Sequence, residues 1–64
     1  MRKVNSPSQF SDDHLIASFY GKSYEEAIKS AKEWAERNNK ALVAYFEQKF
    51  FETILISYKN ETSD

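Results

Sequence analysis

The chain contains no cysteine and only one glycine, one proline and one histidine among its 64 residues. Without cysteine it can form neither a disulfide framework nor a thiolate metal site, and a lone imidazole cannot hold a metal without several carboxylate partners. No apolar run approaches the roughly 18 residues that a membrane span requires. We therefore expect no disulfide, no metal, no cofactor and no contact with the membrane interior.

Neither sign of charge dominates the composition. Nine Lys and Arg residues stand against ten Asp and Glu residues, which leaves a formal net charge of -1. Such a balance creates no broad electrostatic field that would attract nucleic acid or anionic lipid. The first residues are polar rather than apolar and do not resemble a secretory signal, so we expect a cytoplasmic protein.

Hydrophobic residues make up 41% of the chain and aromatic residues 16%, which is enough for a folded core. A chain this short still forms only a thin core, and small proteins that lack disulfides and metals often gain stability by self-association. The sequence predicts a flexible arm over residues 1–13, in which Phe10 is the only large apolar anchor. One domain follows over residues 14–59, and residues 60–64 are predicted to be a disordered tail.

A helix is predicted to begin after Ser23, where Ser23 and Glu26 have the spacing of a capping box. The apolar residues that follow share one stripe at helical spacing: Tyr24, Ala27, Ile28, Ala31, Trp34 and Ala35. Asn38 and Asn39 tolerate the left-handed conformation in which helices often end. The segment therefore has both a start and a stop signal.

Residues 14–20 alternate apolar side chains onto one face and predict a strand that Gly21 ends. Residues 41–58 fit either a helix, which would complete a helical hairpin, or two strands over residues 41–47 and 51–58. We favour strands because the segment is rich in β-branched and aromatic residues. The predicted fold is a small α+β domain of β-α-β-β order, a three-stranded sheet with one amphipathic helix on one face. A right-handed crossover would make the first two strands parallel, and the last strand can lie between them antiparallel to both.

Two local patterns resemble catalytic motifs but lack essential parts. Gly21, Lys22 and Ser23 lie between a strand and a helix like the end of a phosphate-binding loop, yet Ile16 occupies the position of the first glycine that this loop needs. Residues 11–14 contain the residue types of a hydrolase triad, but triads are assembled from separated positions. We therefore expect no catalytic residue and a chain that is not an enzyme.

The predicted strands are apolar on both faces, although a single helix can cover only one of them. We expect the following residues to face the helix: Leu15, Ala17, Phe19, Leu42, Ala44, Phe46, Ile54 and Ile56. We expect these to lie on the opposite face: Ile16, Tyr20, Val43, Tyr45, Phe51 and Leu55. An apolar patch of this kind usually marks an interface.

The sequence thus predicts a small non-enzymatic protein-binding module, such as a regulator, inhibitor or accessory subunit, that forms a homodimer through the helix-free face. In one alternative the arm around Phe10 folds over that face within a monomer. In another, aromatic side chains such as Tyr20, Tyr45 and Phe51 stack single-stranded bases, although few basic residues accompany them. Nothing in the sequence points to a small-molecule substrate.

Overall fold

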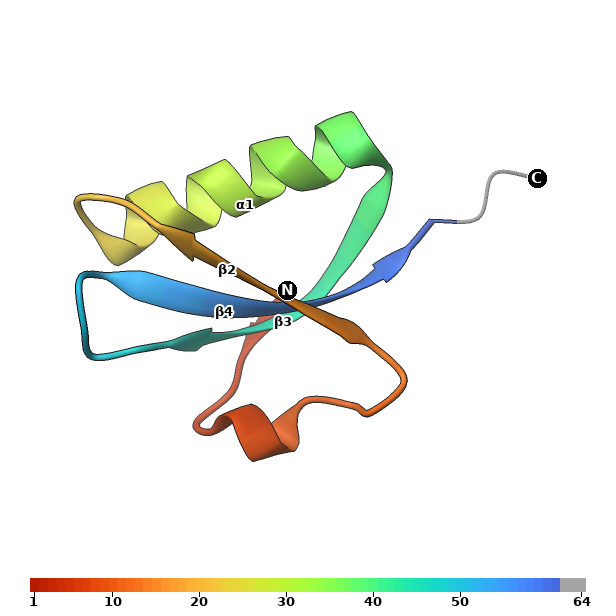
Figure 1. Ribbon diagram of the computed structural model, residues 1–64, viewed down its shortest axis with the longest axis horizontal. Coiled ribbons are helices and arrows are strands. Elements are labelled where there is room, and N and C mark those ends of the chain that lie inside the picture. Colours follow the sequence, from red (N-terminus) through yellow and green to blue (C-terminus); the bar gives the residue numbers. More distant parts are fainter. Residues whose placement is uncertain (62–64) are drawn as a thin grey trace.

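A computed structural model describes residues 1–61 of the chain and shows a helix lying along one side of a sheet (Figure 1). The elements are, in chain order, β1 (Arg2–Lys3), the 3-10 helix η1 (Pro7–Gln9), β2 (Leu15–Tyr20), α1 (Tyr24–Asn38), β3 (Lys40–Glu47) and β4 (Thr53–Asn60). The predicted α+β class is confirmed. The alternative of a helical hairpin is wrong, because both halves of residues 41–58 form strands.

The sheet has the strand order β1-β3-β4-β2. β4 lies in the middle, antiparallel to both β2 and β3, which is the arrangement that a right-handed crossover allowed. β1 adds a short parallel strand beside β3, so the sheet has four strands where we predicted three. The missed strand lies within the segment that we assigned to the arm.

Two contacts attach β1 to β3. The Val4 amide donates a hydrogen bond of 2.8 Å to the carbonyl of Tyr45, and Lys3 Nζ lies 3.0 Å from Glu47 Oε1. The hydrogen bond and the charge of Glu47 raise the pKa of Lys3 above its ordinary value. The Glu47 carboxylate thus favours the charged form of Lys3.

The helix begins and ends where the sequence predicts. Ser23 Oγ accepts a hydrogen bond of 3.2 Å from the Glu26 amide, and Asn39 ends the helix in the left-handed conformation with φ of 55°. Gly21 allows β2 to approach the start of the helix closely, because a Cβ at this position would lie 2.8 Å from Glu26 Cβ and 3.0 Å from the Ala27 nitrogen. Both ends of the helix thus follow from local residue choice.

The core lies between α1 and the middle of the sheet. Ala27 and Ala31 are fully buried against Ile54 and Ile56 of β4. Small helix residues let the helix backbone approach the sheet closely, and the isoleucines supply the buried apolar area. Beside this cluster, the Trp34 ring packs against Phe19 and Tyr58. The centroid of the Trp34 ring lies 5.3 Å from that of Phe19 and 4.9 Å from that of Tyr58. These contacts join the helix to β2 and β4.

A β-bulge between Leu42 and Ala44 changes which side chains of β3 face the helix. Leu42 lies opposite Tyr58, but beyond the bulge Tyr45 lies opposite Ile56 and packs against the core. Our assignment of this strand is therefore wrong after Leu42, since a one-residue insertion exchanges the two faces. The affected residues are Ala44 and Phe46, expected on the helix side, and Tyr45, expected on the far side.

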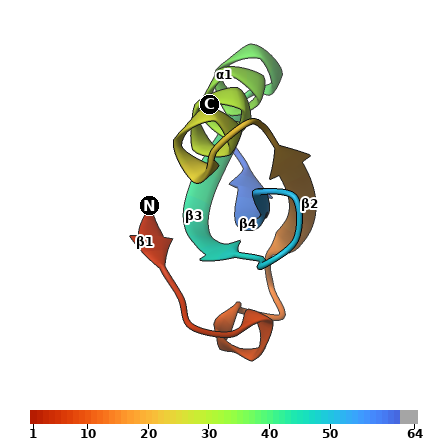
Figure 2. The same cartoon turned by 90° about the vertical axis from the view of Figure 1, so that its left-hand side faces the viewer.

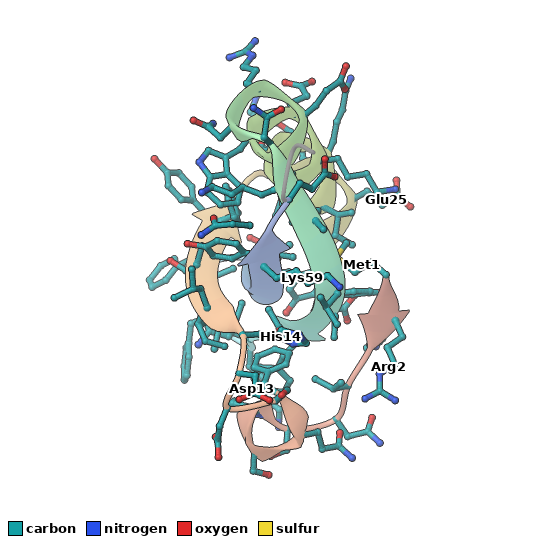
Figure 3. The ribbon with its side chains drawn as sticks, turned by 90° about the vertical axis from the view of Figure 1, so that its right-hand side faces the viewer. Met1, Arg2, Asp13, His14, Glu25 and Lys59 are labelled. Carbon is teal, nitrogen blue, oxygen red and sulfur yellow. The ribbon has the colours of Figure 1, made fainter. Side chains whose placement is uncertain are left out.

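Residues 4–14 cross the sheet on the side opposite the helix, which we call the far face (Figure 2). Val4 is only 5% exposed, and Ser57, which alternates with the helix-facing Ile56, is 1% exposed. Figure 3 shows Asp13 and His14 at this end of the molecule, away from the helix. The first residues thus fold over the far face around Ser57, as in the alternative in which the arm covers that face.

The C-terminal end of the sheet extends further than we predicted. Asn60 is the last residue of β4, and the Glu61 amide donates a hydrogen bond of 3.0 Å to the Asn39 carbonyl. The remaining residues of the predicted tail, 62–64, lie outside the described part of the chain.

Candidate functional site

The structure distributes the six predicted interface residues over four places. Ile16, Tyr20 and Leu55 lie on the far face, because each alternates with a strand neighbour that faces the helix. Val43 is the extra residue of the bulge and is half-buried. The other two lie elsewhere: Tyr45 packs against the core on the helix side, and Phe51 lies in the turn between β3 and β4.

The apolar surface that stays exposed follows β2. Ile16 is 48% exposed and Tyr20 is 78% exposed, and Leu15, on the helix side of the same strand, is also exposed. β2 forms one edge of the sheet, so among residues 1–61 only β4 pairs with it. The strand contains no charged residue, no proline and no bulge. Proteins usually use those features to prevent other chains from adding to an edge.

The far face is therefore more covered near the start of β2 than near its end. Ser57, opposite Ile16, is buried, whereas Tyr20, opposite Thr53, is one of the more exposed large hydrophobic residues of the described chain. Within residues 1–61, the buried atoms His14 Nδ1 and Ser57 Oγ have no hydrogen-bond partner. The exposed apolar surface of the far face is thus smaller than predicted, and it is concentrated on the edge strand β2.

A second apolar feature is the turn that joins β3 to β4. Phe50 and Phe51 are 74% and 85% exposed, and Phe51 and Glu52 both have positive φ angles. Tyr24 of the helix donates its hydroxyl hydrogen bond to the Gln48 carbonyl, which attaches the turn to the start of α1. The turn and the β2–α1 loop lie side by side at one end of the molecule (Figure 1). Our prediction missed Phe50, although two consecutive phenylalanines beside a polar stretch were a visible signal.

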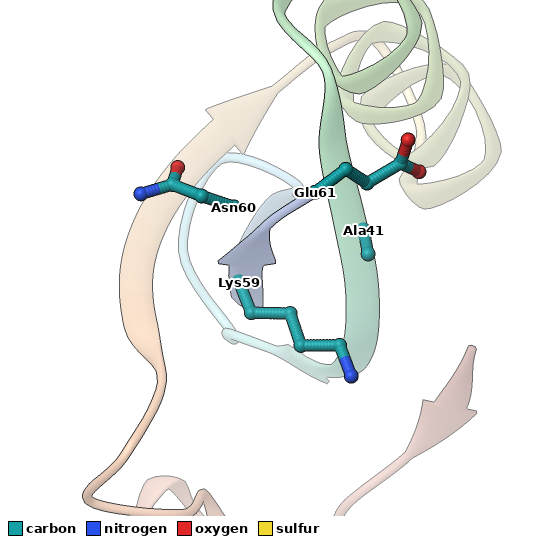
Figure 4. Close-up of a pocket in the computed structure, with 4 residues that line it drawn as sticks. All are labelled: Ala41, Lys59, Asn60 and Glu61. Atoms are coloured by element: carbon teal, nitrogen blue, oxygen red, sulfur yellow. The ribbon is translucent and has the colours of Figure 1, made fainter. Parts of the chain in front are cut away.

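No three His, Cys, Asp or Glu side chains among residues 1–61 gather closely enough to hold a metal ion. Ser23, the serine of the truncated phosphate-loop pattern, caps the helix. The hollow at the end of β3 and β4, shown in Figure 4, is lined by Ala41, Lys59, Asn60 and Glu61. Within the described range no helix has the length and apolar character needed to cross a membrane.

Comparisons of the chain with protein-family models, with curated proteins and with solved structures find no match. The site is therefore interpreted from its geometry. What this geometry offers is an open, uncharged strand edge with apolar side chains, and such an edge can bind another polypeptide.

Proposed function

We propose that the chain is a small non-enzymatic protein-binding module that associates with a second copy of itself through the apolar surface of β2. The observation that carries this proposal is the exposure of Ile16 and Tyr20 on an edge strand that no charge protects. The role fits a regulator, inhibitor or accessory subunit of the cytoplasm, which acts by occupying a partner surface.

The size of the chain supports self-association. The helix contributes only alanines to the fully buried core, and the sheet adds Ile54 and Ile56 at its centre. A core this small supplies limited stability, and association adds buried apolar area without lengthening the chain. Aromatic side chains such as Tyr20 tend to dominate the energy of an interface.

Sedimentation equilibrium over about 1 to 100 μM tests the proposal, since a dissociation constant in this range corresponds to roughly 5 to 8 kcal/mol. We expect a reversible dimer that Tyr20→Ser weakens at least about tenfold, the effect of losing one aromatic anchor. Phe50→Ser is the matched control, because Phe50 is equally exposed but lies outside β2. A monomer at every concentration, or equal weakening by both variants, contradicts the proposal.

A second candidate function is the binding of single-stranded nucleic acid. It is favoured by three exposed rings at one end of the molecule, Tyr20, Phe50 and Phe51, with Lys22 and Lys49 next to them in the sequence. We rank it second because the net charge of -1 offers little attraction to phosphate. Binding of a labelled oligothymidine that Phe50→Ser abolishes and that added salt weakens steeply would favour this function over self-association.

A further inference from the structure

The direction of the main-chain groups on β2 follows from a contact at the other edge of the sheet. The Tyr45 carbonyl accepts a hydrogen bond from Val4, so its main-chain groups point toward β1 and away from β4. Ile56 lies opposite Tyr45, and its main-chain groups therefore point the other way, toward Ala17 of β2. Since main-chain direction alternates along a strand, the N–H and C=O groups of Ile16, Ser18 and Tyr20 point out of the sheet.

These outward groups form an unused hydrogen-bonding edge. No other strand or loop of residues 1–61 bonds to this side of β2. The side chains of the same three residues point to the far face, where Ile16 and Tyr20 are exposed. One strand thus presents free hydrogen-bonding groups together with apolar side chains, the combination used in binding by strand addition.

The edge is complementary to itself when a second copy lies antiparallel with Ser18 at the centre. Ser18 then pairs with Ser18 of the second copy, and Ile16 pairs with Tyr20 of the second copy on both sides of the centre. Each of these pairs exchanges two main-chain hydrogen bonds, and a β-branched residue opposite an aromatic one is a favourable cross-strand pair. The small serine avoids a steric conflict at the two-fold axis.

Charges next to the strand fit the same arrangement. Asp12 and Asp13 precede β2, whereas Lys22 follows it. Antiparallel pairing brings the acidic end of each strand beside the basic end of the other, and a parallel arrangement would bring like charges together. The charge pattern thus favours a second copy of this chain in this orientation.

We infer that two copies pair antiparallel along β2 around a two-fold axis at Ser18, so that the two sheets join into one continuous sheet. This inference rests on the proposed self-association and specifies its geometry. The dimer forms edge to edge, whereas the sequence predicts contact through the helix-free face. Residues 4–14 already cover part of that face, while the edge of β2 stays free.

The absence of native cysteine makes a cross-linking test direct. In a hydrogen-bonded antiparallel pair the Cα atoms lie about 5.5 Å apart, which is within the range that a disulfide spans. We expect Ser18→Cys to form a covalent dimer readily on mild oxidation. Ser30→Cys is the matched control, because Ser30 is an equally exposed serine on α1 and has no reason to meet its counterpart.

A charge exchange tests the register. The double variant Ile16→Lys with Tyr20→Lys places like charges opposite each other at both ends, and we expect it to be monomeric where the parent chain is dimeric. The double variant Ile16→Glu with Tyr20→Lys places opposite charges across the interface, and we expect it to dimerise at least about tenfold more tightly than the double lysine variant, although more weakly than the parent chain. Both variants replace exposed residues, and circular dichroism checks that each is folded.

The outcomes separate the geometry from the function on which it rests. A parent chain that is monomeric overturns both. The parent chain could instead be dimeric while Ser18→Cys cross-links no better than Ser30→Cys, or while both double variants dimerise equally. Either result would overturn the edge pairing and leave self-association through another surface.

Discussion

At the scale of single residues, the turn between β3 and β4 is unusual because its two central residues adopt a left-handed conformation that their side chains disfavour. Phe51 and Glu52 have φ angles of 56° and 44°, and the Thr53 amide donates a hydrogen bond of 3.2 Å to the Phe50 carbonyl. Turns whose two central residues are left-handed normally have Asn and Gly at these positions. The left-handed conformation costs other residues roughly 1 to 2 kcal/mol each.

We therefore expect Phe51→Asn combined with Glu52→Gly to raise the free energy of unfolding by about 1 to 2 kcal/mol, since it relieves this conformational cost. Urea denaturation followed by circular dichroism measures the change. Lys49→Gly, in the same loop but without a positive φ angle, is the control and should not stabilise the chain. An unchanged or lower unfolding free energy in the double variant would contradict this account of the turn.

The position of this turn could not be predicted from its residues. We expected the turn around residues 47–50, and the structure places its centre at Phe51 and Glu52. Propensity favours Phe51 as a strand residue, and no glycine marks the turn. Here the pairing of β3 with β4 determines the local conformation against the preference of the side chains.

At the scale of elements, α1 is the part of the chain that the sequence predicts best. Its N-cap at Ser23 and its left-handed end at Asn39 are both local signals that do not depend on the rest of the fold. β3 is the contrasting case. Its bulge between Leu42 and Ala44 depends on pairing with β4, so no pattern within the strand shows that Tyr45 faces the core.

Removal of the helix cap gives a second stability prediction. We expect Ser23→Ala to lower the free energy of unfolding by about 1 kcal/mol, because the Glu26 amide loses its hydrogen-bond acceptor. Ser30→Ala, at an exposed position inside the same helix, should instead be neutral or slightly stabilising. Thermal unfolding of the two variants at equal concentration makes the comparison, and equal effects would argue against the cap.

At the scale of the whole molecule, the first residues are part of the fold. β1 extends the sheet beyond β3, and Val4 is almost completely buried next to it. Little in the sequence indicates this, because the side chains of Arg2 and Lys3 are exposed and a two-residue strand carries no periodic pattern. Val4, an isolated apolar residue in a polar segment, was an available signal beside Phe10.

We expect Val4→Asp to lower the free energy of unfolding by more than about 2 kcal/mol, since it places a charge without a partner in a buried position. Asn5→Asp is the matched control, because it adds the same charge at the adjacent exposed residue. Circular dichroism during urea denaturation distinguishes the two variants. If Val4→Asp were as stable as Asn5→Asp, the first residues would contribute nothing to the core.

The single tryptophan gives the chain a built-in optical reporter. Because the indole of Trp34 touches one ring from the free edge strand and one from the central strand, its emission reflects the environment at that junction. Dilution of a concentrated sample, followed by fluorescence alone, would show whether the environment of the indole changes as the protein concentration falls. No dye or tag would need to be attached to so small a protein.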